Sequence, residues 1–305
     1  MDIVLLDGGM GQELIRLSSN PAHPQWSAYV MMHEPHIVQQ VHAEYLHAGA
    51  KVLTLNTYST TRRRFQKFGV EDQLIPLQRK AVDLARGAME ETGIDATIAG
   101  CLSPLVGSYH PELLPPDKDL LDEYREMAAL QGPHVDVFIC ETMSKASEAR
   151  MAAIAGAETG KPVWVAWTLN EELGEDGLPR LRSGETVAEA IAALEGVPVE
   201  ALLFNCCPPE VMTAGMPILA ADGRPFGGHA NGFTPIPKGF VLGTTVDMLG
   251  ARKDLGPEAY ADHVMTWIDM GATIVGGCCE VGPAHIAEIS SRLLAHSHAP
   301  VGRAA

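Results

Sequence analysis

Eight short runs of apolar or β-branched residues recur along this chain, and stretches with helical periodicity separate them. Such alternation is typical of a parallel sheet in which each strand is followed by a helix that covers it. Eight of these units in 305 residues fit a (β/α)8 barrel, or TIM barrel, better than a doubly wound sheet. We therefore predict an α/β fold made of a single TIM barrel.

The predicted strands are Ile3–Leu6, Val52–Leu55, Thr97–Ala99, Val135–Ile139, Val163–Thr168, Ala201–Phe204, Pro225–Gly228 and Thr273–Val275. The predicted helices are Ile37–Gly49, Leu74–Thr92, Lys118–Gly132, Ser147–Thr159, Val187–Leu194, Glu210–Ala220, Pro257–Met270 and Pro283–Leu294. The seventh strand is rich in glycine, so its pattern is the weakest of the eight.

No linker, repeat or low-complexity tract divides the chain. We expect one barrel domain over residues 1–295 and a flexible tail over residues 296–305. Two long connections, Arg16–His33 and Asn170–Gly184, follow the first and fifth strands. Long loops at these places in a barrel belong to the face that carries the active site.

Charge and hydropathy exclude several classes of partner. A formal net charge of −16 makes nucleic acid and anionic membrane surfaces poor partners. No apolar stretch approaches the roughly 18–20 residues that a membrane span needs, and the N-terminus lacks the basic and apolar regions of a secretory signal. We therefore expect a cytoplasmic protein, and an oligomer remains possible.

Reactive side chains stand where the predicted strands end. The residues in question are Asp7, Asn56-Thr57, Gly100-Cys101, Cys140-Glu141-Thr142, Asn205-Cys206-Cys207, His229 with Asn231, and Cys278-Cys279. In a TIM barrel the C-terminal ends of all strands lie on one rim, where active sites are built. Thiols and carboxylates that are far apart in sequence should therefore converge there.

Four of the six cysteines form two adjacent pairs, Cys206-Cys207 and Cys278-Cys279. Adjacent cysteines make poor disulfides, because the bridge needs Cα atoms about 5.5–6 Å apart. One cysteine after the sixth strand and two after the eighth would supply three sulfur ligands. Such a set suits zinc, whose open fourth position would take a thiol substrate and favour its deprotonation. The adjacent Gly276 and Gly277 would let the backbone turn sharply.

Other interpretations of these cysteines remain open. Cys278 and Cys279 could be small buried hydrophobic residues. A purely structural zinc site would be closed by a fourth protein ligand, for which Cys207 or His229 could serve.

Asp7 and Glu141 are carboxylates placed directly after apolar runs, so they need a positive or hydrogen-bonding partner. Together they could hold an α-amino group. The alternative is that each caps a helix or pairs with an arginine of the run Arg62-Arg63-Arg64. Residues 8–11, Gly-Gly-Met-Gly, lack the third glycine of a dinucleotide loop, but backbone N–H groups at the following helix start could hold a carboxylate.

Five segments, in this order, resemble the homocysteine S-methyltransferase family. They are LLDGGMGQEL at residues 5–14, LTLNTYSTT at 53–61, DVFICETM at 136–143, NCCPPE at 205–210 and GGCCEVGPAHI at 276–286. The resemblance implies a zinc-dependent TIM barrel that methylates the sulfur of homocysteine to give methionine. It places the Zn²⁺ ligands at Cys206, Cys278 and Cys279, and the homocysteine-binding carboxylates at Asp7 and Glu141. It places the lining of the amino-acid pocket at Gly8, Asn56 and Thr57.

The resemblance leaves the methyl donor open, because Gln12 and the segment Gly100–Pro104 depart from the family pattern. We expect a small sulfonium donor, S-methylmethionine or S-adenosylmethionine, since folate- and cobalamin-dependent members carry further domains. Trp26, Tyr29, Trp164 or Trp167 could offer it an aromatic face, although at least one of the last two should be core. Alternatives are betaine or a corrinoid protein as donor, another small thiol or selenol as acceptor, and a non-enzymatic, structural zinc-binding barrel.

Overall fold

The computed structural model describes residues 2–237, 239–241 and 243–298. Eight parallel strands form one sheet in the order β1-β8-β7-β6-β5-β4-β3-β2. A bridge between Leu6 and Val52 brings β2 back beside β1 and closes the sheet into a barrel. The predicted TIM-barrel fold is confirmed. The strands are β1 Val4–Leu5, β2 Val52–Thr54, β3 Thr97–Leu102, β4 Val137–Met143, β5 Val163–Trp167, β6 Ala201–Asn205, β7 Phe226–His229 and β8 Ile274–Val275.

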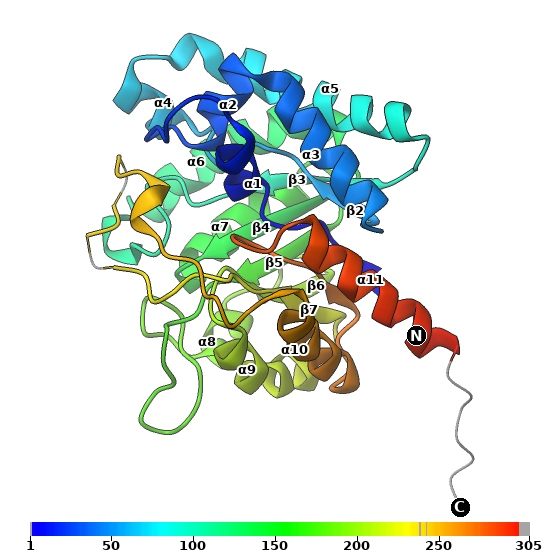
Figure 1. The fold of residues 1–305 in the computed structure, drawn as a ribbon. Helices are drawn as coiled ribbons and strands as arrows, with labels where there is room; N and C mark the ends of the chain where they lie inside the picture. Colours follow the sequence, from blue (N-terminus) through cyan, green and yellow to red (C-terminus); the bar gives the residue numbers. More distant parts are fainter. Residues whose placement is uncertain (1, 238, 242, 299–305) are drawn as a thin grey trace, which may run out of the picture.

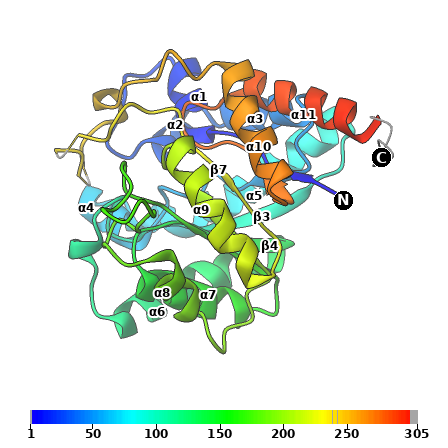
Figure 2. The same ribbon diagram turned by 90° about the horizontal axis from the view of Figure 1, so that it is seen from below.

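Helices surround the strands on the outside of the barrel, as Figures 1 and 2 show from two directions. The helices are α1 Met10–Leu17, α2 Ser27–His33, α3 Pro35–His47, α4 Arg62–Phe68, α5 Leu74–Thr92, α6 Asp117–Gln131, α7 Ala146–Ala157, α8 Val187–Ala192, α9 Pro209–Asp222, α10 Pro257–Asp269 and α11 Pro283–His298. Each helix predicted from the sequence overlaps one of these. Glycines in the left-handed conformation end α4, α5 and α9, and a capping box of Thr186 and Glu189 begins α8.

The observed elements differ from the predicted ones at their ends. β3 and β4 continue beyond the predicted runs, so Gly100, Cys101 and Glu141 lie within strands rather than after them. The long connection predicted after the first strand contains the whole of α2, and α1 was not among the predicted helices. Helix α11 runs through His298, and the rest of the predicted tail, residues 299–305, lies outside the described residues.

Two apolar layers hold the barrel together. A small cluster fills its interior with side chains such as Leu6, Ile139 and Leu203, and a larger cluster packs the helices against the strands. Trp164 packs against the interior cluster, whereas Trp167 belongs to the outer one and is fully buried. Residues three apart on a strand point to opposite faces, and the expectation that at least one of the two tryptophans is core is confirmed.

The weak pattern of the seventh strand has a steric cause. A Cβ atom on Gly227 would lie 1.8 Å from the carbonyl oxygen of Ile274 in β8, so the backbones approach too closely for any side chain. Glycine is required here although it weakens strands in general.

The loops that follow the strands gather at one end of the barrel. In Figure 1 the long loops after β5 and β7 both lie on the left of the molecule, and the loop after β7 extends toward α4. None of the helices in the part of the chain that the structure describes has the length and apolar composition of a membrane span.

Candidate active site

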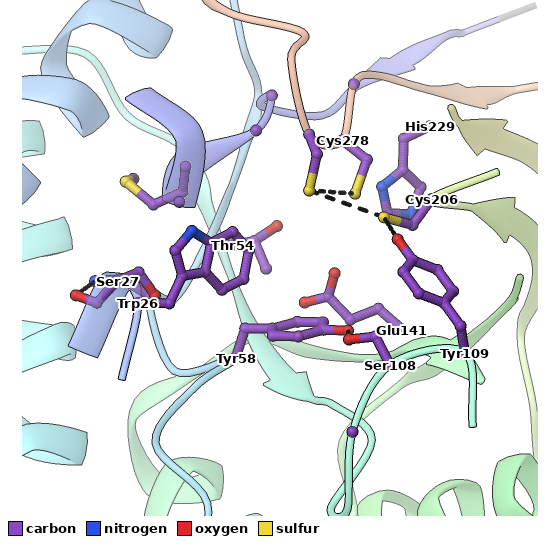
Figure 3. A pocket seen from close by; sticks show the side chains of 18 of the residues that line it. Trp26, Ser27, Thr54, Tyr58, Ser108, Tyr109, Glu141, Cys206, His229 and Cys278 are labelled. Carbon is purple, nitrogen blue, oxygen red and sulfur yellow. Dashed lines mark hydrogen bonds between the residues drawn. The ribbon is translucent and has the colours of Figure 1, made fainter. Parts of the chain in front are cut away.

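A pocket opens among the C-terminal ends of the strands. Its walls include side chains from the ends of six strands, namely Asp7, Thr54, Glu141, Cys206, His229 and Cys278. Residues from the loops complete it, among them Trp26, Tyr58, Ser108 and Tyr109. Figure 3 shows the sulfur atoms on one side of this space and the Glu141 carboxylate and the Tyr58 ring on another.

The sulfur atoms of Cys206, Cys278 and Cys279 form a cluster in which all lie within 4.8 Å of one another. Cys279 Sγ is 3.9 Å from Cys206 Sγ and 4.0 Å from Cys278 Sγ. Two sulfurs bound tetrahedrally at the usual Zn–S distance of about 2.3 Å would be about 3.8 Å apart. The spacing and the soft donor set therefore fit zinc and would disfavour magnesium or calcium.

Backbone contacts fix the direction of each thiol. Cys206 has a φ of +52° and donates its N–H to the carbonyl of His229 at 3.1 Å. Cys278 donates its N–H to the carbonyl of Ala230 at 2.9 Å, so β7 orients both cysteine segments. The preceding Gly277 has no left-handed φ, contrary to the expected sharp turn. It is needed because a Cβ there would lie 2.2 Å from Val281 Cγ1.

The thiols of the cluster share their protons unequally. Hydrogen bonds from Cys278 and Cys279 hold the pKa of Cys206 well below its usual range, with Tyr109 and Asn231 adding to the effect. The Tyr109 hydroxyl lies 3.0 Å from Cys206 Sγ. Interaction with Cys206 raises the pKa values of Cys278 and Cys279. The metal-free cluster thus favours a single thiolate on Cys206.

Cys207 does not join the cluster. Its side chain is buried in the large apolar layer, and burial raises its pKa to about 12. His229 does line the pocket, and its Nε2 atom has no hydrogen-bond partner among the described residues. Of the two residues considered as a closing fourth ligand, only His229 faces the same space as the triad.

Asp7 and Glu141 lie in the same pocket as the sulfurs. Asp7 accepts hydrogen bonds from the Thr54 N–H at 2.7 Å and from the Thr54 hydroxyl at 3.0 Å. Burial nevertheless raises the pKa of Asp7 to about 7. Burial likewise raises the pKa of Glu141 to about 7, although a hydrogen bond with Cys101 acts in the opposite direction and lowers this pKa. Neither carboxylate has a cationic partner within the described part of the chain, so both suit a bound ammonium group.

The arginine run does not neutralise these acids. Arg62 pairs with Glu126 and Arg63 with Glu123, and both glutamates are on α6. Arg64 lines the pocket instead. The alternative in which an arginine of this run pairs with Asp7 or Glu141 is therefore wrong.

Backbone strain concentrates around the pocket. Five non-glycine residues in the described ranges have a positive φ: Trp26, Tyr109, Thr142, Cys206 and Glu280. Three of them line the pocket, and the other two directly follow Glu141 and Cys279. The Thr142 N–H donates to Asn205 Oδ1 at 2.7 Å, and Asn205 Nδ2 donates to the Thr142 hydroxyl at 3.0 Å. Strain of this kind persists where surrounding contacts impose it, as at functional sites.

Gly8 and Asn56 line the pocket, as the sequence predicted, but Thr57 is not among the lining residues. Asn56 Nδ2 donates to the Ser27 carbonyl at 3.4 Å, and Thr57 is fully buried. The role of all three toward a ligand stays a prediction.

Aromatic side chains form a further wall of the pocket. The Trp26 and Tyr58 rings meet edge to face, with centroids 5.7 Å apart, and both line the pocket. Tyr29 stacks on His23 instead, and neither it nor Trp164 nor Trp167 lines the pocket. Tyr58 and Tyr109 were not predicted from the sequence. Tyr58 directly follows Thr57, so its position after β2 was an available signal, whereas nothing in the sequence singles out Tyr109.

Comparisons with known proteins agree with this geometry. The family model described as homocysteine S-methyltransferase matches residues 4–293. Homocysteine S-methyltransferase of Escherichia coli K12 is 29% identical over 95% of each chain. Selenocysteine Se-methyltransferase of Brassica oleracea var. italica is 26% identical over 95% of this chain and 88% of that one.

A solved structure shows the same fold. The metallated form of the homocysteine methyltransferase MmuM from Escherichia coli superposes with a TM-score of 0.78, at 28% identity over 96% of each chain. The family match spans the whole barrel and includes every strand end described above. The chain therefore belongs to the homocysteine S-methyltransferase family and is an S-methyltransferase.

Proposed function

We propose that this enzyme moves a methyl group from a small sulfonium donor to the sulfur of homocysteine, giving methionine, and that it depends on zinc. The observation that carries the proposal is a three-cysteine cluster facing a pocket that also holds two carboxylates, neither of which has a cationic partner among the described residues. Three thiolate ligands leave zinc one position open, as in catalytic sites.

In this proposal Cys206, Cys278 and Cys279 hold the Zn²⁺ ion. When bound there, zinc lowers the pKa of a coordinated thiol, so that homocysteine is present as a nucleophilic thiolate near neutral pH. The low pKa of Cys206 prepares the cluster for a cation, because one ligand already favours its deprotonated form.

Asp7 and Glu141 then bind the ammonium group of homocysteine. Both are buried and lack a cationic partner in the part of the chain that the structure describes, so a bound ammonium would stabilise the ionised form that burial disfavours. The first turn of α1, which includes the lining residue Gly11, offers backbone N–H groups to the substrate carboxylate. Gly8 and Asn56 complete this part of the wall, and Thr57 supports it from behind.

The Trp26 and Tyr58 rings lie across the pocket from the thiols and suit the positive charge of a sulfonium donor (Figure 3). In the reaction, an electron pair of the homocysteine sulfur forms a bond to the methyl carbon. The bond from that carbon to the sulfonium sulfur breaks, and its electron pair stays on the leaving thioether. Holding both substrates in line contributes on the order of 7–11 kcal/mol to lowering the barrier.

The first test is an assay of the zinc-loaded enzyme with homocysteine and a donor carrying a labelled methyl group. We expect labelled methionine with S-methylmethionine or S-adenosylmethionine, and little with betaine. Absorption at the zinc edge should change from three sulfurs and one lighter atom to four sulfurs when homocysteine is added. Four sulfurs throughout, with no transfer, would instead indicate a closed structural site.

A selenol is the second acceptor to test, because the relative from Brassica oleracea is named a selenocysteine Se-methyltransferase. A competition assay with equal amounts of homocysteine and selenocysteine separates the two acceptors directly. We also propose a cytoplasmic location, which six free cysteines support, since thiols persist in reducing compartments.

A further inference from the structure

The three consecutive arginines at the start of α4 have different surroundings. Arg62 and Arg63 are held by Glu126 and Glu123 of α6. Arg64 is half-buried, and its guanidinium makes no hydrogen bond or ion pair with any residue that the structure describes. An arginine that is partly removed from water normally has an acidic or carbonyl partner.

Arg64 lies in the wall of the active-site pocket. Burial lowers its pKa, and the neighbouring Tyr58 phenol opposes this effect. Tyr58 is also the residue whose ring meets Trp26 in the aromatic wall. The guanidinium is therefore on the side of the pocket where the proposed donor lies.

The charges of the pocket are complementary to two amino-acid ligands rather than one. Asp7 and Glu141 provide the place for one ammonium group, and the first turn of α1 beside Asp7 offers N–H donors for one carboxylate. These groups together account for homocysteine. Arg64 is the one cationic side chain in the described lining other than the titratable His229, and homocysteine does not require it.

We propose that Arg64 binds the carboxylate of the methyl donor and thereby makes the enzyme selective for sulfonium amino acids. This inference rests on the function proposed above. A guanidinium binds a carboxylate through two parallel hydrogen bonds, which fixes the orientation of the ligand as well as its position. S-methylmethionine and S-adenosylmethionine share this carboxylate, so both are donors of the class that Arg64 selects.

The test compares S-methylmethionine with its decarboxylated analogue, which keeps the sulfonium and the amino group. Binding of each compound to zinc-loaded enzyme is measured by calorimetry for the wild type, Arg64→Gln and Arg64→Lys. We expect Arg64→Gln to raise the Kd of S-methylmethionine at least about tenfold and to leave that of the analogue unchanged. Arg64→Lys should give an intermediate Kd, because lysine keeps the positive charge but cannot form the two parallel hydrogen bonds of a guanidinium. The same titrations with S-adenosylmethionine show which of the two donors the enzyme accepts.

Arg63→Gln is the matched control, since it removes a neighbouring guanidinium that pairs outside the pocket. The proposal would be overturned if Arg64→Gln weakened the binding of S-methylmethionine and of its analogue equally. It would also be overturned if the variant lost affinity for homocysteine and kept its affinity for both sulfonium compounds. A failure of the wild type to bind any sulfonium amino acid would overturn it as well. Because binding is measured without turnover, the result is independent of catalysis. Arg64-dependent binding without methyl transfer would refute only the proposed function, and transfer that is insensitive to Arg64 would refute only this inference.

Discussion

Cys206 and Cys207 are neighbours in sequence with opposite environments. The side chain of Cys206 faces the pocket and the other two thiols, whereas that of Cys207 is packed among apolar residues behind β6. The positive φ of Cys206 accompanies this change of direction. Neither composition nor spacing distinguishes the two residues. The family resemblance pointed to the first of them, and Cys206 is the one that lies together with Cys278 and Cys279. Its role as a metal ligand stays a prediction.

This contrast leads to a prediction about metal content. Cys206→Ala should reduce bound zinc from about one ion per chain to a small fraction, because a site of two thiolates binds the ion far more weakly. Cys207→Ala should keep its zinc, since that thiol is outside the cluster. Metal analysis of the purified variants measures this, and equal zinc loss in both would contradict the proposed ligand set.

Glu141 supports a prediction on pH and stability in the metal-free protein. Burial raises its pKa from 4.5 to about 7 in the folded state, so between these values the folded chain binds more protons than the unfolded one. Stability then falls as the pH rises through this window, and the loss is complete above about pH 7. Glu141→Gln should therefore raise the unfolding free energy at pH 8 by on the order of 2 kcal/mol and have little effect at pH 4.

Denaturant unfolding at the two pH values measures the effect. Glu200→Gln, at an exposed position, serves as the control and should change stability at neither pH. The same Glu141→Gln variant should bind homocysteine less tightly, because it loses a charge opposite the ammonium. If Glu141→Gln were less stable than the wild type at pH 8, burial of the ionised Glu141 carboxylate would not be destabilising and the prediction would be wrong.

At the scale of elements, the close approach of β7 and β8 makes Gly227 a strong constraint. Gly227→Ala places a methyl group against the backbone oxygen of Ile274, which cannot move without breaking the sheet. We expect a loss of at least about 2 kcal/mol of stability or a failure to accumulate soluble protein. Gly239→Ala is the control, because the added Cβ would meet only the end of Met248 at 4.0 Å. Comparable melting temperatures for the two variants would contradict the steric argument.

The elements themselves were largely predictable, because alternating apolar runs and amphipathic stretches determine a barrel. The strand ends followed from the same pattern, and they brought Asp7, Glu141 and the three cysteines of the cluster to one rim. The loop residues were not predictable in this way. Periodicity does not reveal where a loop side chain such as Tyr109 points. Arg64 looks identical to Arg63 in sequence, and only the position of Glu123 on α6 separates them.

At the scale of the whole molecule, the active site and the core are separate. The apolar layers lie inside the barrel and beneath the helices, and the cysteine cluster sits at the strand ends beyond them. A barrel of this size buries enough apolar surface to fold without a metal, unlike a small zinc domain. Zinc should therefore act as a ligand of a folded protein rather than as a condition for folding.

Removing zinc with a chelator tests this separation. Far-UV circular dichroism should remain unchanged, while the melting temperature should fall by about 5 °C, because a ligand present at 100 times its Kd stabilises by about 2.7 kcal/mol. Homocysteine should then raise the melting temperature of the zinc-loaded enzyme but not of the metal-free one, since its thiol binds through the metal. If the chelator instead unfolds the chain, the cysteines hold the barrel together and the site is structural. If homocysteine stabilises both forms equally, Asp7 and Glu141 bind it without help from the metal.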